Sequence, residues 1–222
     1  MFEFLGQYLP TIANGLALTV EVTLFGVFAG LGLGTLLALG DIYGGRIPSV
    51  LIRVFVEFFR GSPLIVQLFV SQYALPALLN IQVSPYITAF TVFALNSGAY
   101  QKGYIKGALE TVSNDQMQAG LSVGMSGKQT LWHVIIPQAF RIVIPAWSNE
   151  FCSLTKSTSA LGFVGFMDLT GAGRTIAGQA YIIIPAWLII AAIYLTWITM
   201  FTKVADIIYE RKKIPGLEIS PI

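Results

Sequence analysis

Residues 61–101, GSPLIVQLFVSQYALPALLNIQVSPYITAFTVFALNSGAYQ, contain no aspartate, glutamate, lysine or arginine. This stretch is about twice the roughly 20 residues that a helix needs to cross a bilayer, so it must turn back on itself. Three residues near its middle favour a loop: Pro76, Asn80 and Pro85. The stretch therefore predicts two membrane-spanning helices, at roughly 63–79 and 85–108.

The composition of the whole chain agrees with a membrane protein. The 222 residues are 55% hydrophobic and 11% charged, and that charged fraction is under half of the roughly 25% found in soluble domains. In lipid the backbone must satisfy its own hydrogen bonds, which favours helices. We predict an all-α integral membrane protein that forms one domain over residues 1–222.

Charged residues mark the ends of the remaining spans. Three more apolar stretches give spans at roughly 11–39, 138–167 and 176–202, which makes five in total. With the N-terminus outside, eleven lysines and arginines lie at or near the cytoplasmic side, and only Lys156 and Arg174 lie toward the outside. Because cytoplasmic segments retain lysine and arginine, this bias predicts an external N-terminus and a cytoplasmic C-terminus.

Two features of the first half concern packing. In the stretch 42–60, Arg53, Glu57 and Arg60 share one helical face, which predicts an interfacial helix, the foot of the second span or a helix end reaching water. Gly26, Gly30 and Gly34 recur at a spacing typical of close helix packing, either between two spans of one chain or between two subunits.

Several classes of function are excluded. The net charge of +2 comes from few, scattered side chains, so no nucleic-acid surface is expected. The single cysteine, Cys152, cannot form an internal disulfide, and the single histidine, His133, cannot build a histidine-ligated metal site. We expect no metal and no cofactor.

The polar segment 111–137 is too long for a turn. Two pairs in it have the spacing of a capping box: Ser113 with Gln116, and Ser126 with Gln129. They predict two short helices, separated at Gly124 and Gly127, of which the second ends before Pro137. Four apolar residues are expected to be exposed as a docking surface for another protein, or else to pack on the bundle: Met117, Leu121, Met125 and Leu131.

From Gln118 this segment reads QAGLSVGMSGKQTLWHVIIP, which resembles the EAA loop of ABC-importer permeases. That loop has Glu-Ala-Ala, three residues, Gly, nine residues, Ile, one residue and Leu-Pro. The stretches VEFFRGSPLIVQLF from Val56, LNSGAY from Leu95 and SNEF from Ser148 are similar to polar amino-acid permeases, which take up histidine, arginine, lysine, glutamine or glutamate. The similarity covers roughly residues 19–210.

The resemblance implies a type I ABC-importer permease with five spans in the inner membrane of a prokaryote. It implies two ATP-binding subunits, an extracytoplasmic amino-acid-binding protein, and a second permease that is either identical or a paralogue. This chain has no phosphate-binding loop, because Ser122 and Gln129 flank Gly127-Lys128 where glycine and Ser or Thr are required. It is therefore expected to be a transport subunit and not an enzyme.

The resemblance also implies that coupling to the ATPase runs through residues 115–137. The residues that match the motif there, and that we expect to couple, are Gln118, Ala119, Gly120, Gly124 and Pro137. Gln118 replaces the usual glutamate and Gly120 the second alanine, so docking is expected to be weaker or tuned to a particular ATPase. Lys102-Gly103 stands where the family commonly has Ala-Glu.

Ionisable groups inside spans are costly and are therefore functional candidates. Glu150 lies beside Asn149 and within two turns of Lys156, and an amino acid could pair its ammonium and carboxylate groups with such opposite charges. We expect Glu150 to contact the substrate, with Asn96, Tyr100 and Asn149 lining the path. The alternatives are that Glu150 pairs with Lys156 or with a neighbouring helix, and that Lys156 extends to water.

Two other classes of protein fit this sequence less well than an ATP-driven importer. An ion-coupled secondary transporter commonly has inverted repeats with broken helices, and no such pair of segments is found in this sequence. An intramembrane hydrolase would need its histidine in the site, whereas His133 falls in the cytoplasmic loop.

Overall fold

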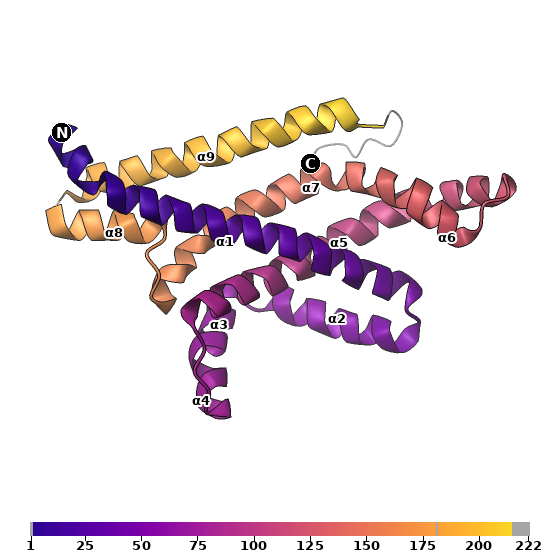
Figure 1. The fold of residues 1–222 in the computed structure, drawn as a ribbon, viewed down its shortest axis with the longest axis horizontal. Coiled ribbons are helices and arrows are strands. Elements are labelled where there is room, and N and C mark those ends of the chain that lie inside the picture. Colours follow the sequence, from indigo (N-terminus) through magenta and orange to yellow (C-terminus); the bar gives the residue numbers. More distant parts are fainter. Residues whose placement is uncertain (1, 181, 215–222) are drawn as a thin grey trace.

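The computed structural model describes residues 2–180 and 182–214, and all regular elements in these ranges are helical (Figure 1). In chain order they are α1 (Phe2–Tyr43), α2 (Arg46–Gly61), α3 (Leu64–Phe69), the π-helical η1 (Val70–Ala74), α4 (Leu75–Leu79), α5 (Pro85–Ser122), α6 (Gly127–Thr130), the π-helical η2 (Leu131–Ile135), α7 (Ile136–Ser157), the 3-10 helix η3 (Thr158–Val164), α8 (Leu169–Ala180) and α9 (Ile183–Lys212). The predicted all-α class is confirmed.

Helices α1 and α5 form the centre of the molecule (Figure 1). A Cβ atom at Gly26 would lie 3.1 Å from the Phe93 Cβ, and one at Gly34 would lie 2.9 Å from the Lys102 backbone nitrogen. Such close approach of two backbones requires small residues. The glycine repeat of α1 therefore packs two helices of the same chain together.

A charged group joins the end of α1 to α2 and α5. The Asp41 side chain is fully buried, and its Oδ2 accepts hydrogen bonds from Lys102 Nζ and Lys106 Nζ, each at 2.7 Å. Ser49 of α2 donates a hydrogen bond to Asp41 Oδ1, and Arg53 Nε lies 3.5 Å from the same oxygen. Lys102, which departs from the family pattern, thus has its counter-charge in α1.

Two helices of the described ranges are long and apolar enough to cross a membrane, Gly6–Tyr43 and Ile183–Lys212. The shorter apolar helix over Leu64–Leu79 coincides with a predicted span. The count of five spans and the orientation of the termini stay predictions.

Two predicted spans differ from the helices that the structure contains. The helix expected over 176–202 begins at Ile183, because Pro185 sits in the first turn of α9 and favours a helix start there. The helix expected over 138–167 ends at Ser157 and continues only as the 3-10 helix η3. Gly165, at a φ of 91°, then adopts the left-handed conformation and closes that element.

The segment 111–137 also differs in part from the two short helices predicted for it. The Ser126–Gln129 capping box is confirmed, with bonds of 2.8 and 3.3 Å. The Ser113–Gln116 box is wrong, because α5 runs unbroken to Ser122 and offers no free helix start. The second helix was also wrongly predicted to end before Pro137. The π turn η2 carries the chain into α7, where the proline occupies the first turn and needs no donor.

Candidate functional site

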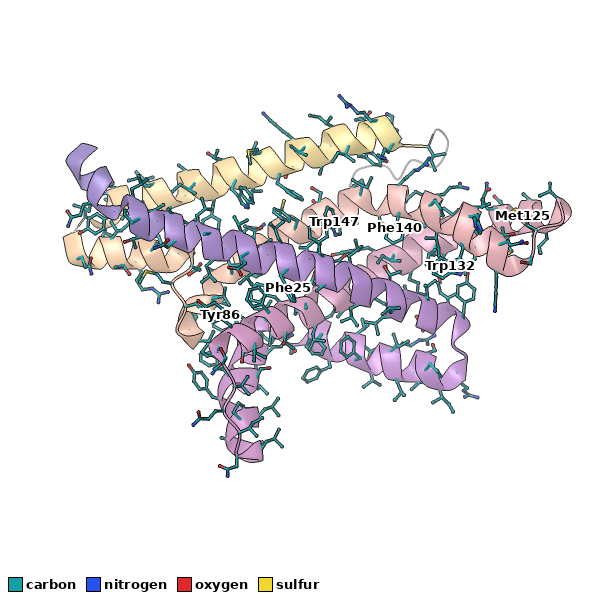
Figure 2. The ribbon with its side chains drawn as sticks, in the orientation of Figure 1. Phe25, Tyr86, Met125, Trp132, Phe140 and Trp147 are labelled. Carbon is teal, nitrogen blue, oxygen red and sulfur yellow. The ribbon has the colours of Figure 1, made fainter. Side chains whose placement is uncertain are left out.

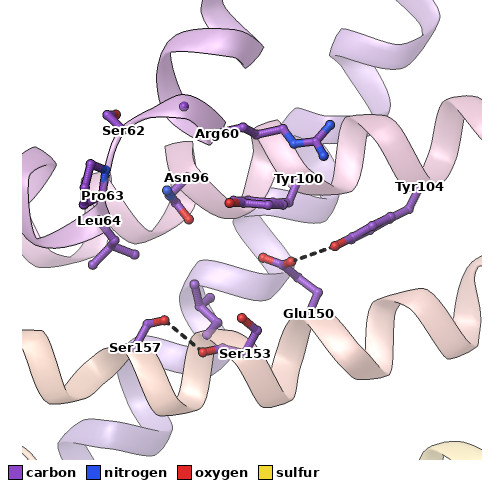
Figure 3. Close-up of a pocket in the computed structure, with 12 residues that line it drawn as sticks. Arg60, Ser62, Pro63, Leu64, Asn96, Tyr100, Tyr104, Glu150, Ser153 and Ser157 are labelled. Carbon is purple, nitrogen blue, oxygen red and sulfur yellow. Dashed lines mark hydrogen bonds between the residues drawn. The ribbon is translucent and has the colours of Figure 1, made fainter.

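A cavity of about 480 Å³ lies where α2 bends into α3, between α5 and α7 (Figure 3). We call it the charged cavity. Its lining residues are Arg60, Gly61, Ser62, Pro63, Leu64, Asn96, Tyr100, Tyr104, Glu150, Ser153, Leu154 and Ser157. Its volume lies within the roughly 300–1,000 Å³ of small-molecule sites.

Two buried amides hold the bend that forms one wall. Gln67 Nε2 donates to the carbonyl oxygens of Phe59 and Ser62, at 2.8 and 3.0 Å. Asn96 Nδ2 donates to the Phe59 carbonyl at 3.3 Å and to Gln67 Oε1 at 3.1 Å. These bonds satisfy carbonyl groups that the end of α2 leaves without helical partners. They fix where Arg60, in the last turn of α2, enters the cavity.

The opposite wall supplies a carboxylate. Glu150 of α7 is only 4% exposed, and its Oε2 accepts a hydrogen bond from the Tyr104 hydroxyl at 3.5 Å (Figure 3). The Arg60 guanidinium lies over the Tyr100 ring, 5.2 Å from its centroid. The cavity therefore presents a carboxyl group and a guanidinium group to the same space.

The structure brings together three of the five residues expected on the substrate path. Glu150, Asn96 and Tyr100 all line the charged cavity, whereas Asn149 and Lys156 are exposed and do not. No ion pair between Glu150 and Lys156 occurs among the described residues.

Sequence reasoning missed the other nine residues that line the charged cavity, among them Arg60 and Tyr104. Arg60 was assigned only to a charged helix face, although it belongs to the VEFFRGSPLIVQLF stretch that resembles the permeases. Tyr104 lies one helical turn after Tyr100, so the same face of the predicted span carries both. The cationic residue that lines the cavity is therefore Arg60 and not Lys156.

The expected coupling residues lie in a hairpin over residues 111–137, which we call the loop hairpin. Helix α5 ends there in a left-handed cap: Gly124 has a φ of 84°, and the Met125 and Gly124 amides bond the Gly120 and Leu121 carbonyls, each at 3.0 Å. Thr130 is fully buried against Gly120, where any Cβ would collide with the threonine side chain. This contact explains glycine in place of the usual alanine.

The remaining expected coupling residues, Gln118, Ala119 and Pro137, are exposed on the loop hairpin. Of its apolar residues, Leu121, Val123 and Trp132 are strongly exposed. Figure 2 shows Met125 near the turn and Trp132 on the arm after it. Met117 and Leu131 pack on the core between α5 and α7, which agrees with the packing alternative. The hairpin therefore combines a packed inner side with an uncovered apolar outer side.

The chain belongs to the family described as binding-protein-dependent transport system inner membrane component, whose model matches residues 26–214. The L-cystine transport system permease protein TcyL of Bacillus subtilis (strain 168) is 30% identical over 205 residues, which cover 90% of this chain and 86% of that protein. The glutamine transport system permease protein GlnP of Escherichia coli (strain K12) is 29% identical over 207 residues, 93% of this chain and 94% of that one.

A solved structure shares the fold. It is described as the crystal structure of an amino acid ABC transporter with histidines, and it matches with a TM-score of 0.86 at 28% identity. The match covers 95% of this chain and 98% of the other. The type I importer permease fold and the family resemblance found in the sequence are thereby confirmed.

Proposed function

We propose that this chain is the permease subunit of an ATP-driven importer that carries a polar amino acid across the inner membrane of a prokaryote. The family match and the names of the similar permeases support this proposal. The observation that carries it is the charged cavity, where Glu150 and Arg60 line the same space.

An amino acid fits this arrangement chemically. Its ammonium group pairs with the Glu150 carboxylate, and its carboxylate takes two parallel hydrogen bonds from the Arg60 guanidinium. Asn96 and the two tyrosines supply polar contacts for the side chain. An unpaired carboxylate within a span is costly in free energy. A substrate whose ammonium group pairs with Glu150 therefore stabilises the substrate-bound state.

Transport then requires alternating access driven from outside this chain. We infer that two ATP-binding subunits dock on the loop hairpin, around Gln118, Ala119, Gly120, Gly124 and Pro137, and that their closure changes which side the cavity faces. An extracytoplasmic binding protein delivers the substrate, and a second copy or a paralogue completes the membrane unit.

Reconstitution tests the proposal. The chain is placed in proteoliposomes with a candidate ATPase and binding protein, and ATP hydrolysis is measured with and without glutamine, cystine, histidine and arginine. The expected result is stimulation by one of these amino acids together with uptake that stops without ATP. Uptake that runs on an ion gradient with no ATPase present would instead identify a secondary transporter.

A further inference from the structure

A second cavity lies at the corner between α1 and α2, away from the charged cavity. It has a volume of about 450 Å³ and is lined by Asp41, Ile42, Gly45, Arg46, Ser49, Val50 and Arg53. In Figure 1, α2 runs along the end of α1 at the edge of the molecule.

The corner carries an excess of positive charge. Asp41 is its acidic group, and the Asp41 oxygens are already occupied by Lys102, Lys106 and Ser49. The Arg53 side chain is 62% exposed and touches Asp41 only through Nε, at 3.5 Å. Arg46 has no ion pair among the described residues. Two guanidinium groups therefore keep donors available for an anion from outside the chain.

An exposed apolar stripe starts at the same corner. The residues of this stripe follow one face of α2 and are Ile47, Val50, Leu51, Val54 and Phe58, each 52–75% exposed. From Ile47 to Phe58 the stripe is about 16 Å long at 1.5 Å per residue. One leaflet of the hydrocarbon core is about 15 Å thick, so the stripe matches the depth that one acyl chain covers.

We propose that this corner binds an anionic phospholipid, with its phosphate between Arg46 and Arg53 and one acyl chain along the α2 stripe. Guanidinium groups form paired hydrogen bonds with phosphate oxygens and retain their charge. Val50 belongs both to the cavity and to the stripe, so headgroup and chain contacts are continuous. Free phosphate would use only the polar half of this surface. The lipid would hold the α1–α2 corner at the membrane surface.

Lipid retention by the purified full-length chain tests the proposal. Dioleoylphosphatidylglycerol and dioleoylphosphatidylcholine are titrated in detergent, and bound lipid is counted by native mass spectrometry. We expect the chain to prefer the anionic dioleoylphosphatidylglycerol. The R46Q/R53Q substitutions should weaken the apparent affinity for this lipid by roughly 30-fold. The control R211Q/K212Q removes the same charge from the last turn of α9 and should change nothing.

Further arms separate the possible outcomes. The R46K/R53K variant keeps the charge and serves as the control for misfolding. It should retain most of the preference for dioleoylphosphatidylglycerol. The L51S/V54S variant should weaken lipid binding through the stripe alone. Equal retention of both lipids by the unaltered chain, or an unchanged preference in R46Q/R53Q, would overturn the proposal. Complete displacement of the lipid by an excess of inorganic phosphate would identify a phosphate site and also overturn the proposal.

Discussion

The Tyr104 hydroxyl donates to Glu150 Oε2 at 3.5 Å, a contact between α5 and α7 across 46 positions of sequence. It fixes the carboxylate at the edge of a cavity that Arg60 enters from α2. Three helices far apart in sequence therefore supply the groups that an amino acid would need.

The Glu150→Gln variant should lose most of its response to substrate, because the amide cannot pair with an ammonium group. A hydrogen bond to a charged group contributes about 1.5–3 kcal/mol, so the half-saturating amino-acid concentration should rise roughly 10- to 150-fold. The measurement is amino-acid-stimulated ATP hydrolysis in proteoliposomes. Asn149→Ala, next in sequence but outside the cavity, is the control, and an unchanged response in Glu150→Gln would remove Glu150 from the site.

Two substitutions of Arg60 should distinguish the contribution of its positive charge from that of the planar guanidinium group. Arg60→Lys keeps a cation but loses the fork that binds both carboxylate oxygens, so we expect partial loss, and Arg60→Gln should lose more. The readout is the same half-saturating concentration. Lys156→Gln should have no effect, since Lys156 is exposed and lies outside the cavity. A larger effect of Lys156→Gln than of Arg60→Gln would restore the original expectation for Lys156.

Gly120→Ala should destabilise the loop hairpin, because the added methyl group collides with the buried Thr130 side chain. Overpacking of this kind costs about 1–3 kcal/mol, measured as a fall in the thermal midpoint of the detergent-solubilised chain. Gly107→Ala is the matched control on α5, where a Cβ meets nothing within 4 Å. The double variant G120A/T130A should recover stability. If it does not, the steric explanation fails.

Asp41→Asn should destabilise the contact between α1 and α5. It leaves the Lys102 side chain, only 9% exposed, without its counter-charge, and breaking a buried ion pair costs about 3–5 kcal/mol. Glu110→Gln removes an exposed partner of Lys106 at 3.7 Å and should cost less than about 1 kcal/mol. Thermal unfolding compares the two. Equal midpoints for both variants would contradict the stabilising role of Asp41.

The predicted membrane orientation, with the N-terminus outside and the C-terminus in the cytoplasm, can be tested by cysteine labelling. In a Cys152→Ser background, a cysteine placed at Gly6 should react with an impermeant maleimide in intact cells. A cysteine placed at Lys212 should react only after the membrane is opened. The reverse pattern would invert the predicted topology.

Much of the fold followed from the scarcity of charge. The uncharged residues 61–101 predicted a reversal, and the structure places α4 and α5 on either side of it. The break between α2 and α3 falls at the predicted start of the second span, whereas the break between α8 and α9 was harder to predict. It depends on Pro185, whose effect was hidden by the apolar run around it.

The candidate site was only partly predictable for a related reason. Glu150 stood out because carboxylates are rare in apolar helices, but its neighbours are decided by how α2, α5 and α7 meet. Lys156 was chosen because it is near Glu150 in sequence. The bend held by Gln67 and Asn96 places Arg60 in the cavity instead, and no spacing along the chain encodes that placement.

The unbroken course of α5 gives the two walls of the charged cavity unequal mechanical properties. Tyr104 and Ala119 belong to one stiff rod, about 22 Å apart at 1.5 Å per residue, so a tilt of roughly 10° would displace one end by about 4 Å relative to the other. The path from Glu150 to the loop hairpin crosses Pro145 and the π turn η2, which interrupt regular helical bonding. The α5 wall would therefore move as one rigid body, whereas the α7 wall can bend between Glu150 and the loop hairpin. A displacement of the loop hairpin would then move the two walls of the cavity by different amounts.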